Sequence, residues 1–447
     1  MVVPNQTIDR PKGRKEPHAM QRIAPSQQVR QQVAQLLNGG LQDESSPISR
    51  LVQLAVQMVL QEVLEQEVSD HLGRARYQRR QPGEEHRGYR NGYEPGRMRT
   101  AEGEIDVEVP QVRDAPTPYR SKLMTFLGGH SEVLERLAVE MYARGLSTRD
   151  VEDALQEATG QPLLSRTAVS ELTETLWDQY QAFSQRDLSA FEVEYLFLDA
   201  VYESLRLQGG GKEGVLCAWA ICRDGNKVLL HLGLGNKESY ANWLDFLRDM
   251  ARRGLHDPVL GTTDGAPGLI RAFEEVFPHS LRQRCLAHKM RNITDKLPDY
   301  ARAEVKAEIE TAYYAANQNL AKRIGADIVA QYEAGFPSAM RSFQEDFDAC
   351  IAYLRCPAVH HKRIRTTNLL ERCFLEERRR TKVIPRFFSE RSCLKLAFAA
   401  LWRASQRWRR VTMSDDELRR LRQLRHELNL PDYEPTDSEG QTRSIAA

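Results

Sequence analysis

The sequence predicts an α/β protein, in which buried strands alternate with amphipathic helices. Two apolar runs, Tyr195 to Leu198 and Val259 to Leu260, are typical of buried strands, and an acidic residue follows each run closely. Between them lie a tight-turn signal at Asp224-Gly225-Asn226 and a segment, 239–252, whose apolar residues recur at helical spacing. At 447 residues, the chain is long enough for two or three domains, each with a buried core.

Basic residues are unevenly distributed along the chain. The totals nearly cancel, at 63 Lys plus Arg against 62 Asp plus Glu, so the net charge indicates no partner. From Arg74 to Arg99, however, there are eight Arg and three Glu, and from His361 to Arg410 there are fifteen Lys or Arg and four Glu. Such stripes are typical of polyanion binding, and a solvated surface is the alternative interpretation.

Cysteine usage and hydropathy exclude two classes of protein. Seven cysteines, an odd number without regular spacing, argue against a secreted disulfide scaffold. No run approaches the ~18 apolar residues of a membrane span, and Met1 to Met20 is polar, unlike a signal peptide. We therefore expect a soluble, cytoplasmic protein.

The N-terminal part divides into a tail and a helical, basic region. Residues 1–45 are rich in Gln, Pro, Arg and Gly and predict a disordered tail. Region 46–130 begins with an amphipathic helix over 46–71, whose apolar stripe needs a partner in its own domain or in a second subunit. It continues with the Arg-rich stretch, in which Asn91-Gly92 predicts a turn, and with a short strand ending at Pro110.

Residues 131–185 predict three helices resembling a helix-turn-helix DNA-binding domain. Ser147 and Ser165 stand in capping positions before the second and third helices. In a helix-turn-helix the second helix of the pair reads a DNA groove, so the candidate DNA contacts are Arg166, Thr167 and Ser170. An ordinary helical bundle is the alternative.

Residues 190–294 predict three strands in a meander, a helix and further strand–helix units. This is the order of a ribonuclease-H-like α/β core, in which the first and fourth strands are neighbours and Asp199 and Asp264 converge. The last strand is expected over Leu281–His288. Residues 295–362 predict an all-α insertion, residues 363–412 the last part of the core, and residues 413–447 a C-terminal tail.

Three carboxylates form the candidate catalytic site: Asp199, Asp264 and Glu371, the last on a helix expected over Asn368–Thr381. Carboxylates at neighbouring strand ends can share divalent cations, and Mg²⁺, or Mn²⁺ in its place, prefers such hard oxygen ligands. Arg378 lies two helical turns after Glu371 and Arg365 precedes it, so both are candidate DNA contacts. For an isolated Asp, a surface or capping role is the alternative.

Cys285 and His288 form a Cys-x-x-His pair close in sequence to Asp264. This is half of a zinc site, and Cys356 with His360 could supply the other half. The alternative is a thiol and an imidazole that pack or hydrogen-bond beside Asp264.

Seven short motifs in order resemble the bacterial Mutator-like transposases, a family of insertion-sequence enzymes with a DDE triad of acidic residues. They span roughly residues 85–400, and their order makes the resemblance specific. The motifs are Arg90-Asn-Gly-Tyr93, Met141-Tyr-Ala-Arg-Gly-Leu-Ser-Thr-Arg149, Phe197-Leu-Asp-Ala-Val-Tyr202, Glu238-Ser-Tyr-Ala-Asn-Trp243, Thr263-Asp-Gly265, Arg284-Cys-Leu-Ala-His288 with Arg291-Asn292, and Arg365-Thr-Thr-Asn-Leu-Leu-Glu-Arg372.

The resemblance implies that Asp199, Asp264 and Glu371 are the catalytic triad and that Cys285 and His288 are the family signature beside the second aspartate. It also implies binding to the terminal inverted repeats of double-stranded element DNA, metal-dependent nicking, and strand transfer to target DNA. The segment after Glu371, Arg372-Cys-Phe-Leu-Glu-Glu, is more acidic than the family pattern. That departure leaves the phosphate contacts open and leaves the triad intact.

Two other functions fit parts of the sequence. A host-adopted DNA-binding regulator would use the helix-turn-helix and carry vestigial acids, although all three acids are intact. A ribonuclease-H-like nuclease would cut without joining, although the N-terminal DNA-binding region favours recognition of element ends. Holding two DNA ends requires at least two subunits, so we expect a homodimer, with the 51–68 helix as a candidate seam.

Overall fold

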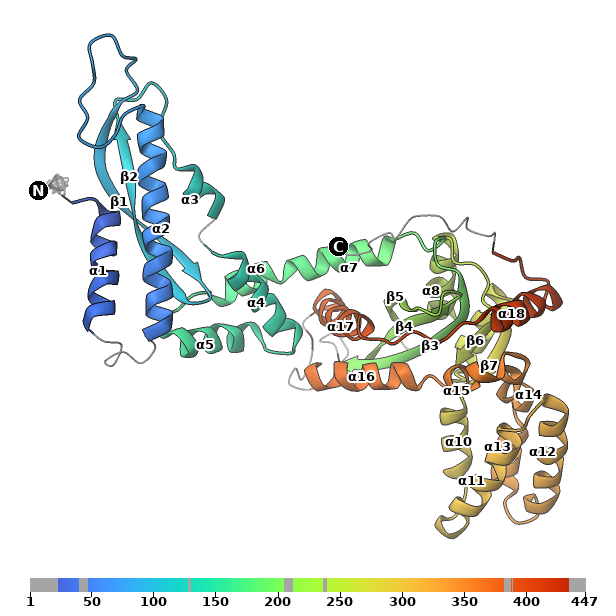
Figure 1. Cartoon of the computed structure of the whole chain (residues 1–447). Coiled ribbons are helices and arrows are strands. Elements are labelled where there is room, and N and C mark those ends of the chain that lie inside the picture. Colours follow the sequence, from blue (N-terminus) through green and yellow to red (C-terminus); the bar gives the residue numbers. More distant parts are fainter. Residues whose placement is uncertain are drawn as a thin grey trace, which may run out of the picture. The chain divides into compact units, whose positions relative to one another are not determined.

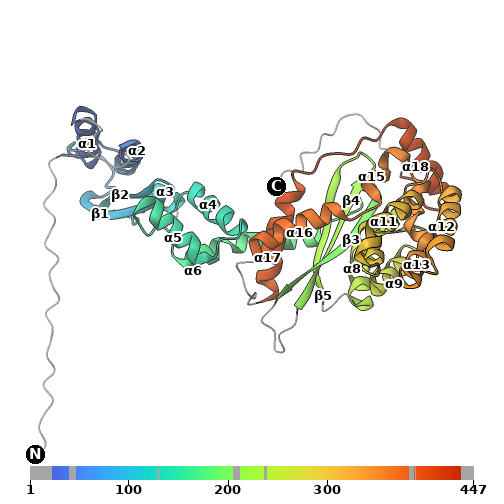
Figure 2. The same cartoon turned by 90° about the horizontal axis from the view of Figure 1, so that it is seen from below.

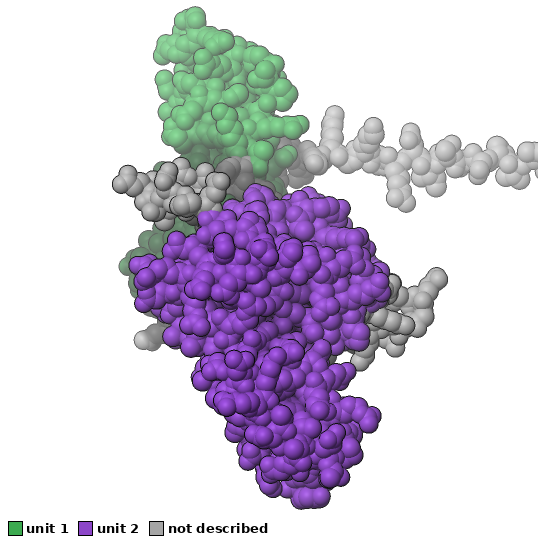
Figure 3. Space-filling model, turned by 90° about the vertical axis from the view of Figure 1, so that its right-hand side faces the viewer, with its two compact units in different colours: residues 1–142, 147–172 green, residues 143–146, 173–447 purple. Residues whose placement is uncertain are grey.

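The computed structural model describes residues 23–39, 47–127, 130–204, 212–235, 239–381, 387 and 389–433. They form two compact units, here called unit 1 (residues 1–142 and 147–172) and unit 2 (residues 143–146 and 173–447) (Figure 3). In the described part of the chain, no helix is long and apolar enough to cross a membrane.

Unit 1 is built on one long helix and one β-hairpin. Its elements are α1 (Pro25–Gly39), α2 (Pro47–Leu72), β1 (Tyr89–Thr100), β2 (Gly103–Arg113), α3 (Lys122–Leu127), α4 (Glu132–Ala143), α5 (Thr148–Thr159) and α6 (Arg166–Leu172). Helix α2 packs its apolar stripe on the hairpin, where Leu64 is buried with Ile105 and Val107. The glutamines of α2 also donate to the hairpin backbone, with Gln57 Nε2 2.7 Å from the Asp106 carbonyl oxygen.

The stripe of α2 thus finds its partner within unit 1, one of the two alternatives that the sequence left open. A second apolar row remains exposed on α2, formed by Ile48, Val52, Val59 and Val63. This row is compatible with the predicted dimer seam, which stays a prediction.

The predicted disordered tail over residues 1–45 is wrong for Pro25–Gly39, which is helix α1. This helix is held by tertiary contacts that its composition does not reveal. The Ser26 hydroxyl donates to the Glu65 carboxylate at 2.8 Å, and Val29 is buried.

The hairpin also differs from its prediction. Strand β1 occupies the last part of the Arg-rich stretch, and Asn91-Gly92 forms a bulge within this strand instead of a turn between elements, with Gly92 at φ +78°. Strand β2 continues past Pro110 because a two-stranded sheet has free edges, where a missing N–H costs little.

Helices α4 to α6 belong to the same unit as the hairpin, and do not form a separate 131–185 domain. Ser131 N–H donates to the Arg99 carbonyl oxygen at 2.8 Å and Glu104 N–H donates to Gln161 Oε1 at 2.6 Å, which joins the two parts. Ser147 caps α5 as predicted. The predicted third helix, however, breaks at Thr173, and its continuation, α7 (Glu174–Gln185), belongs to unit 2.

Unit 2 contains a five-stranded mixed sheet in the order β5-β4-β3-β6-β7. Its strands are β3 (Val193–Ser204), β4 (Lys212–Cys222), β5 (Lys227–Gly235), β6 (Leu260–Thr263) and β7 (Leu281–Arg284), with α8 (Tyr240–Arg252) and α9 (Pro267–Val276) as connections. Strand β3 is antiparallel to β4 and parallel to β6, so the predicted neighbourhood of the first and fourth strands is confirmed.

Alternation along β3 assigns its residues to two faces of the sheet. Leu196 and Leu198 join the core cluster that contains Trp243 of α8 and Phe273 of α9. Phe197 points the other way and stacks on Trp219 at 3.9 Å between ring centroids. In Figures 1 and 2, α8 and α17 (Glu390–Ser405) lie on opposite sides of the sheet. Asp199 has the same parity as Phe197 and therefore faces away from the α8 cluster.

The predicted strand over Leu281–His288 is wrong in its second half. Strand β7 ends at Arg284, and α10 (Leu286–Thr294) begins immediately after Cys285. The change occurs where the N–H of Leu286 donates to the Arg365 carbonyl oxygen at 3.0 Å, and no longer to a neighbouring strand.

Helices fill the segment between the sheet and the end of the chain (Figure 1). They are α11 (Asp299–Tyr313), α12 (Gln318–Tyr332), α13 (Pro337–Gln344), α14 (Phe347–Cys350), the short 3₁₀ turns η1 (Ala352–Arg355) and η2 (Ala358–His360), α15 (His361–Ile364), α16 (Asn368–Thr381), α17 and α18 (Asp415–Glu427). The helix predicted over Asn368–Thr381 is confirmed as α16.

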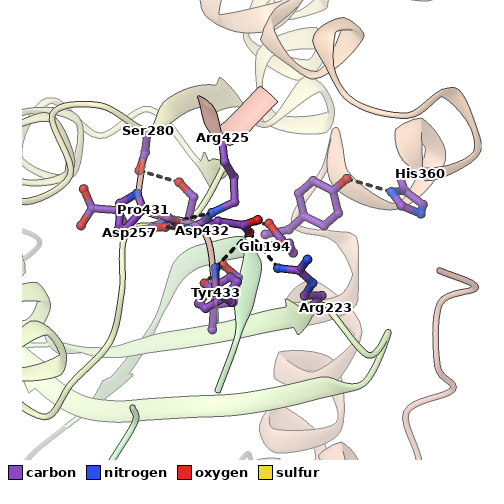
Figure 4. Close-up of polar contacts among 12 residues, drawn as sticks. Glu194, Arg223, Asp257, Ser280, His360, Arg425, Pro431, Asp432 and Tyr433 are labelled. Carbon is purple, nitrogen blue, oxygen red and sulfur yellow. Dashed lines mark hydrogen bonds and ion pairs between the residues drawn. The ribbon is translucent and has the colours of Figure 1, made fainter. Parts of the chain in front are cut away.

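The prediction of a C-terminal tail is wrong for residues 414–433. These residues pack against the start of β3 (Figure 4). Arg425 of α18 is fully buried and donates to Glu194 Oε2 at 3.2 Å and to the Pro431 carbonyl oxygen at 2.8 Å. The Tyr433 hydroxyl donates to the Val193 carbonyl oxygen at 2.7 Å. Burial raises the pKa of Glu194, and the Arg425 charge opposes this increase. Residues 434–447 lie outside the described residues.

Breaking this buried pair should destabilise unit 2. We expect Arg425→Met to lower the free energy of unfolding by about 3–5 kcal/mol, because Glu194 would stay buried without its cation. All five tryptophans lie in unit 2, so denaturation followed by tryptophan fluorescence reports on this unit.

The matched control is Arg419→Met on the same helix, where the arginine is exposed and forms its ion pair with exposed Asp416. It should change the stability by less than about 1 kcal/mol. The double variant Glu194→Met with Arg425→Met should recover part of the loss, since no buried charge remains. Equal stability of wild type and Arg425→Met would contradict the assignment.

Candidate active site

The three predicted acidic residues come from β3, the end of β6 and the first turn of α16. Residue Phe197 pairs with Thr262 across the parallel strands, and extending this register by two residues puts Asp199 opposite Asp264. Asp199 is only 6% exposed, and its Oδ1 accepts from Ala200 N–H at 2.9 Å. Asp264 Oδ1 accepts from Ala266 N–H at 2.9 Å, which fixes the turn into α9.

His288 of α10 links the acids. Its Nε2 lies 3.3 Å from Glu371 Oε1. A hydrogen bond with Cys285 raises the pKa of His288 to about 9 against the opposing effect of burial, and the charges of Asp199 and Glu371 add to the increase. The imidazole is therefore a cation at neutral pH, surrounded by acidic groups.

The pKa of Asp199 is raised above its ordinary value. Burial raises the pKa of Asp199 to about 7, with a further increase from the Asp264 charge, while His288 opposes both. Burial would likewise raise the pKa of the Cys285 thiol, but the neighbouring His288 holds it below its usual value. Perturbed groups that act on one another in this way are typical of functional sites.

Residues 364–367, just before α16, contact the sheet and so position Glu371. The Thr262 hydroxyl donates to the Ile364 carbonyl oxygen at 2.7 Å, and Thr367 N and Oγ1 each lie 3.4 Å from Cys285 Sγ. Thr367 also hydrogen-bonds Asp199. Sequence reasoning missed this positioning role, although the residue stands within the Arg365–Arg372 motif.

Arg284 was also missed as a site residue. Its side chain is only 7% exposed, and within the described residues its Nε and Nη1 atoms have no hydrogen-bond partner. The guanidinium lies against Gly265, at φ +98°, where a Cβ would overlap it. A buried cation with unsatisfied donors beside Gly265, the residue after Asp264, is suited to an anion. The available signal was the arginine that opens the Arg284–His288 motif.

Asp199, Asp264 and Glu371 offer carboxylate oxygens, which are the ligands that Mg²⁺ and Mn²⁺ prefer. The effect of the Asp264 charge on Asp199 is the repulsion that a bound cation would relieve. Among the described residues, however, no three His, Cys, Asp or Glu side chains lie close enough together to hold a metal ion. Glu371 is paired with His288 instead, so cation binding has to compete with the imidazolium.

The four-residue zinc site is not formed. The ring of His360, labelled in Figure 4, is hydrogen-bonded on both sides. Its Nδ1 lies 2.8 Å from the Tyr195 hydroxyl, and its Nε2 lies 3.1 Å from the Thr412 carbonyl oxygen. Cys356 is buried, and burial raises the pKa of its thiol to about 12, which disfavours metal binding. These two residues support the fold.

The predicted DNA contacts lie on two helices and one turn. Arg166, Thr167 and Ser170 are exposed on α6, and Arg166 Nε lies 3.3 Å from Glu152 Oε2 of α5. Arg378 is exposed on α16, two turns after Glu371. Arg365 follows α15 directly, with its guanidinium stacked on the Tyr314 ring at 4.0 Å.

Unit 1 holds a larger basic surface than α6. A cavity of about 990 Å³ lies between α2, β1 and the 73–88 loop. Six arginines line this Arg cavity against three glutamates: Arg74, Arg76, Arg79, Arg80, Arg90 and Arg113. Five of the eight arginines of the Arg-rich stretch therefore line one concave surface, together with Arg113.

Comparison with known proteins identifies relatives over most of the chain. The sequence is 32% identical over 372 residues to the transposase for insertion sequence element ISRM5 of Rhizobium meliloti, covering 83% of this chain and 92% of the relative. It is 36% identical over 282 residues to the IS6120 transposase of Mycolicibacterium smegmatis, covering 63% and 86%. It is 27% identical over 356 residues to the IS256 transposase of transposon Tn4001 in Staphylococcus aureus, covering 78% and 89%.

The family model described as "Transposase, Mutator family" matches residues 27–411. This match includes the three acids, the Cys285–His288 pair and the Arg cavity. The chain therefore belongs to the Mutator family of transposases.

Proposed function

We propose that the protein is a DDE transposase with a ribonuclease-H-like core, which binds the terminal inverted repeats of its insertion sequence, nicks the DNA and transfers the freed strand to target DNA. The observation that supports the proposal is that Asp199 and Asp264 stand in register on neighbouring parallel strands, while His288 lies 3.3 Å from Glu371 and acts on the charge of Asp199. The names of the relatives, which are transposases of insertion sequences, support the same reaction class.

Asp199, Asp264 and Glu371 are the residues that would hold the divalent ions in this proposal. Bound Mg²⁺ or Mn²⁺ activates an attacking oxygen and stabilises a leaving one in phosphodiester chemistry. Ala200 N–H and the Thr367 hydroxyl orient the Asp199 carboxylate, and the segment 364–367 positions Glu371. His288 pairs with Glu371 and its charge opposes the increase in the pKa of Asp199.

Two arginines supply phosphate contacts in the same proposal. Arg284 presents unsatisfied donors beside Gly265, the residue after Asp264, and a guanidinium group can bind two phosphate oxygens at once. Arg378 extends the basic surface along α16. Both contacts would orient the scissile strand relative to the acids.

Element ends are recognised by unit 1, with the Arg cavity as the main phosphate contact. Its six arginines outnumber its acids, whereas Arg166 on α6 is partly neutralised by Glu152. Phosphate contacts provide affinity, and base contacts from α6 would add specificity. The exposed row on α2 would join two subunits, which a reaction on two DNA ends requires.

The catalytic part is tested by metal-dependent nicking of labelled DNA that carries the flanking element ends. We expect Asp199→Asn to lower the nicking rate at least about a hundredfold, because metal-assisted charge stabilisation contributes several kcal/mol. Chelation of the metal should abolish nicking and joining in the wild type.

The matched control is Asp299→Asn, at an exposed aspartate that caps no catalytic element. It should nick and join at the wild-type rate. Tight end binding without metal-dependent cleavage, equal in wild type and Asp199→Asn, would leave a DNA-binding regulator. Nicking without joined products would leave a nuclease.

The Arg cavity is tested by the salt dependence of binding to duplex DNA with the element ends. Each lost phosphate contact should reduce the slope of log K against log salt by about 0.9, so Arg79→Ala with Arg80→Ala should reduce it by nearly 2. Arg120→Ala, at an exposed arginine outside the cavity, should leave the slope unchanged. If Arg166→Ala reduces the slope and the double variant does not, α6 is the phosphate-binding element.

A further inference from the structure

Besides the Arg cavity of unit 1, the protein has a cavity in unit 2, next to the acidic residues. The proposed nicking and strand-transfer reaction does not use this cavity. It has a volume of about 430 Å³ and lies where α10, α11, α15 and the start of α16 meet. This volume falls in the range of about 300–1,000 Å³ that small-molecule ligand sites occupy. We call it the tyrosine cavity, because Tyr313 and Tyr314 form part of its wall.

The tyrosine cavity is strongly basic. Four cationic side chains line it, Arg291, Lys306, Lys362 and Arg365, against the single carboxylate of Glu310. Glu310 lies 3.9 Å from Lys306, an exposed pair that neutralises little. Within the part of the chain that the structure describes, Arg291 and Lys362 form no ion pair. A concave site with this charge attracts a polyanion.

An aromatic platform stands in the wall of the cavity. The Tyr314 side chain is 47% exposed, and the Arg365 guanidinium stacks on its ring at 4.0 Å. Arg365 is also hydrogen-bonded to the Tyr353 hydroxyl, which in turn donates to the Tyr313 carbonyl oxygen at 2.6 Å. The ring and the guanidinium are thus held in place, while part of the ring remains open to solvent.

The tyrosine cavity is joined to the acids by consecutive residues. Arg365 and Thr366 line the cavity, and Thr367, the next residue, hydrogen-bonds Asp199 and contacts Cys285. Asn368 lines the cavity as well and begins the helix that carries Glu371. A strand lying across the acids can therefore place its neighbouring nucleotide in the cavity.

We propose that the tyrosine cavity binds an unpaired nucleotide of the reacting DNA strand, with its base stacked on Tyr314 and its phosphates on Arg291, Lys306 and Lys362. This inference rests on the proposed function, because it identifies the strand at the acids as DNA. An exposed ring with a stacked arginine in a basic groove is the usual arrangement for single-stranded nucleic acid, since every base has a face that can stack. A duplex keeps its bases paired and cannot fill the cavity.

Photocross-linking of the full chain tests the proposal. The probe is a short single-stranded oligothymidylate that carries one iodouracil, in buffer with chelator, and the cross-linked residue is found by peptide mass spectrometry. We expect the cross-link on Tyr314, and we expect Tyr314→Ala to lose it and to bind the strand about tenfold more weakly. Tyr314→Phe should keep both affinity and cross-link.

Tyr300→Ala is the matched control, because Tyr300 is an exposed tyrosine of α11 that does not line the cavity. It should behave as the wild type. Cross-links confined to unit 1, unchanged affinity of Tyr314→Ala, or equal cross-linking by the fully paired duplex would overturn the proposal. Nicking of element DNA by the same preparations separates the two claims. Normal nicking without a cross-link at Tyr314 would contradict the nucleotide-binding inference and leave the catalytic proposal standing. A cross-link at Tyr314 without nicking would contradict the catalytic proposal and leave this inference standing.

Discussion

Parallel pairing between β3 and β6 places two acidic residues from distant parts of the chain at one edge of the sheet. The backbone register aligns Phe197 with Thr262, and the strand alternation turns Asp199 away from the apolar cluster under α8. Everything else at the site attaches to this edge. The segment 364–367 docks on Thr262 and Cys285, and α10 starts where β7 ends, so Glu371 and His288 approach the aspartates from two further elements.

The site concentrates charge that is costly to bury. The Asp264 charge disfavours the ionised form of Asp199, Glu371 is paired with His288, and Arg284 has donors without partners among the described residues. Such an arrangement destabilises the free protein and is relieved by ligands of opposite charge, a cation at the carboxylates and a phosphate at the guanidinium. The fold accordingly contributes stability elsewhere, at the apolar cluster around Trp243 and at the Arg425–Glu194 pair.

Sequence patterns predicted those parts of the molecule that local rules determine. Ser147 and Ser165 were both predicted as caps, and each side chain accepts a hydrogen bond from a backbone N–H group of the first turn of the helix that follows it. The neighbourhood of β3 and β6 followed from the order of strands and helices. Local patterns failed where contacts with residues distant in sequence determine the structure. Helix α1 is held by Glu65, and residues 414–433 are held by Glu194 and Val193. The same holds at the site, where the triad was predicted from motifs but the roles of Thr367, Arg284 and Tyr314 depend on contacts made across the fold.

The buried ion pair between Arg425 and Glu194 affects how the protein folds during translation. Translation produces β3 long before α18, so the Glu194 carboxylate emerges without its cation and the first strand of the sheet lacks the Tyr433 hydrogen bond. Domains fold as units while the chain leaves the ribosome. Unit 1 is complete once residue 172 has emerged, whereas unit 2 needs nearly the whole chain. A nascent chain therefore exposes unit 1 first, and any product terminated before α18 carries unit 1 with an incomplete unit 2.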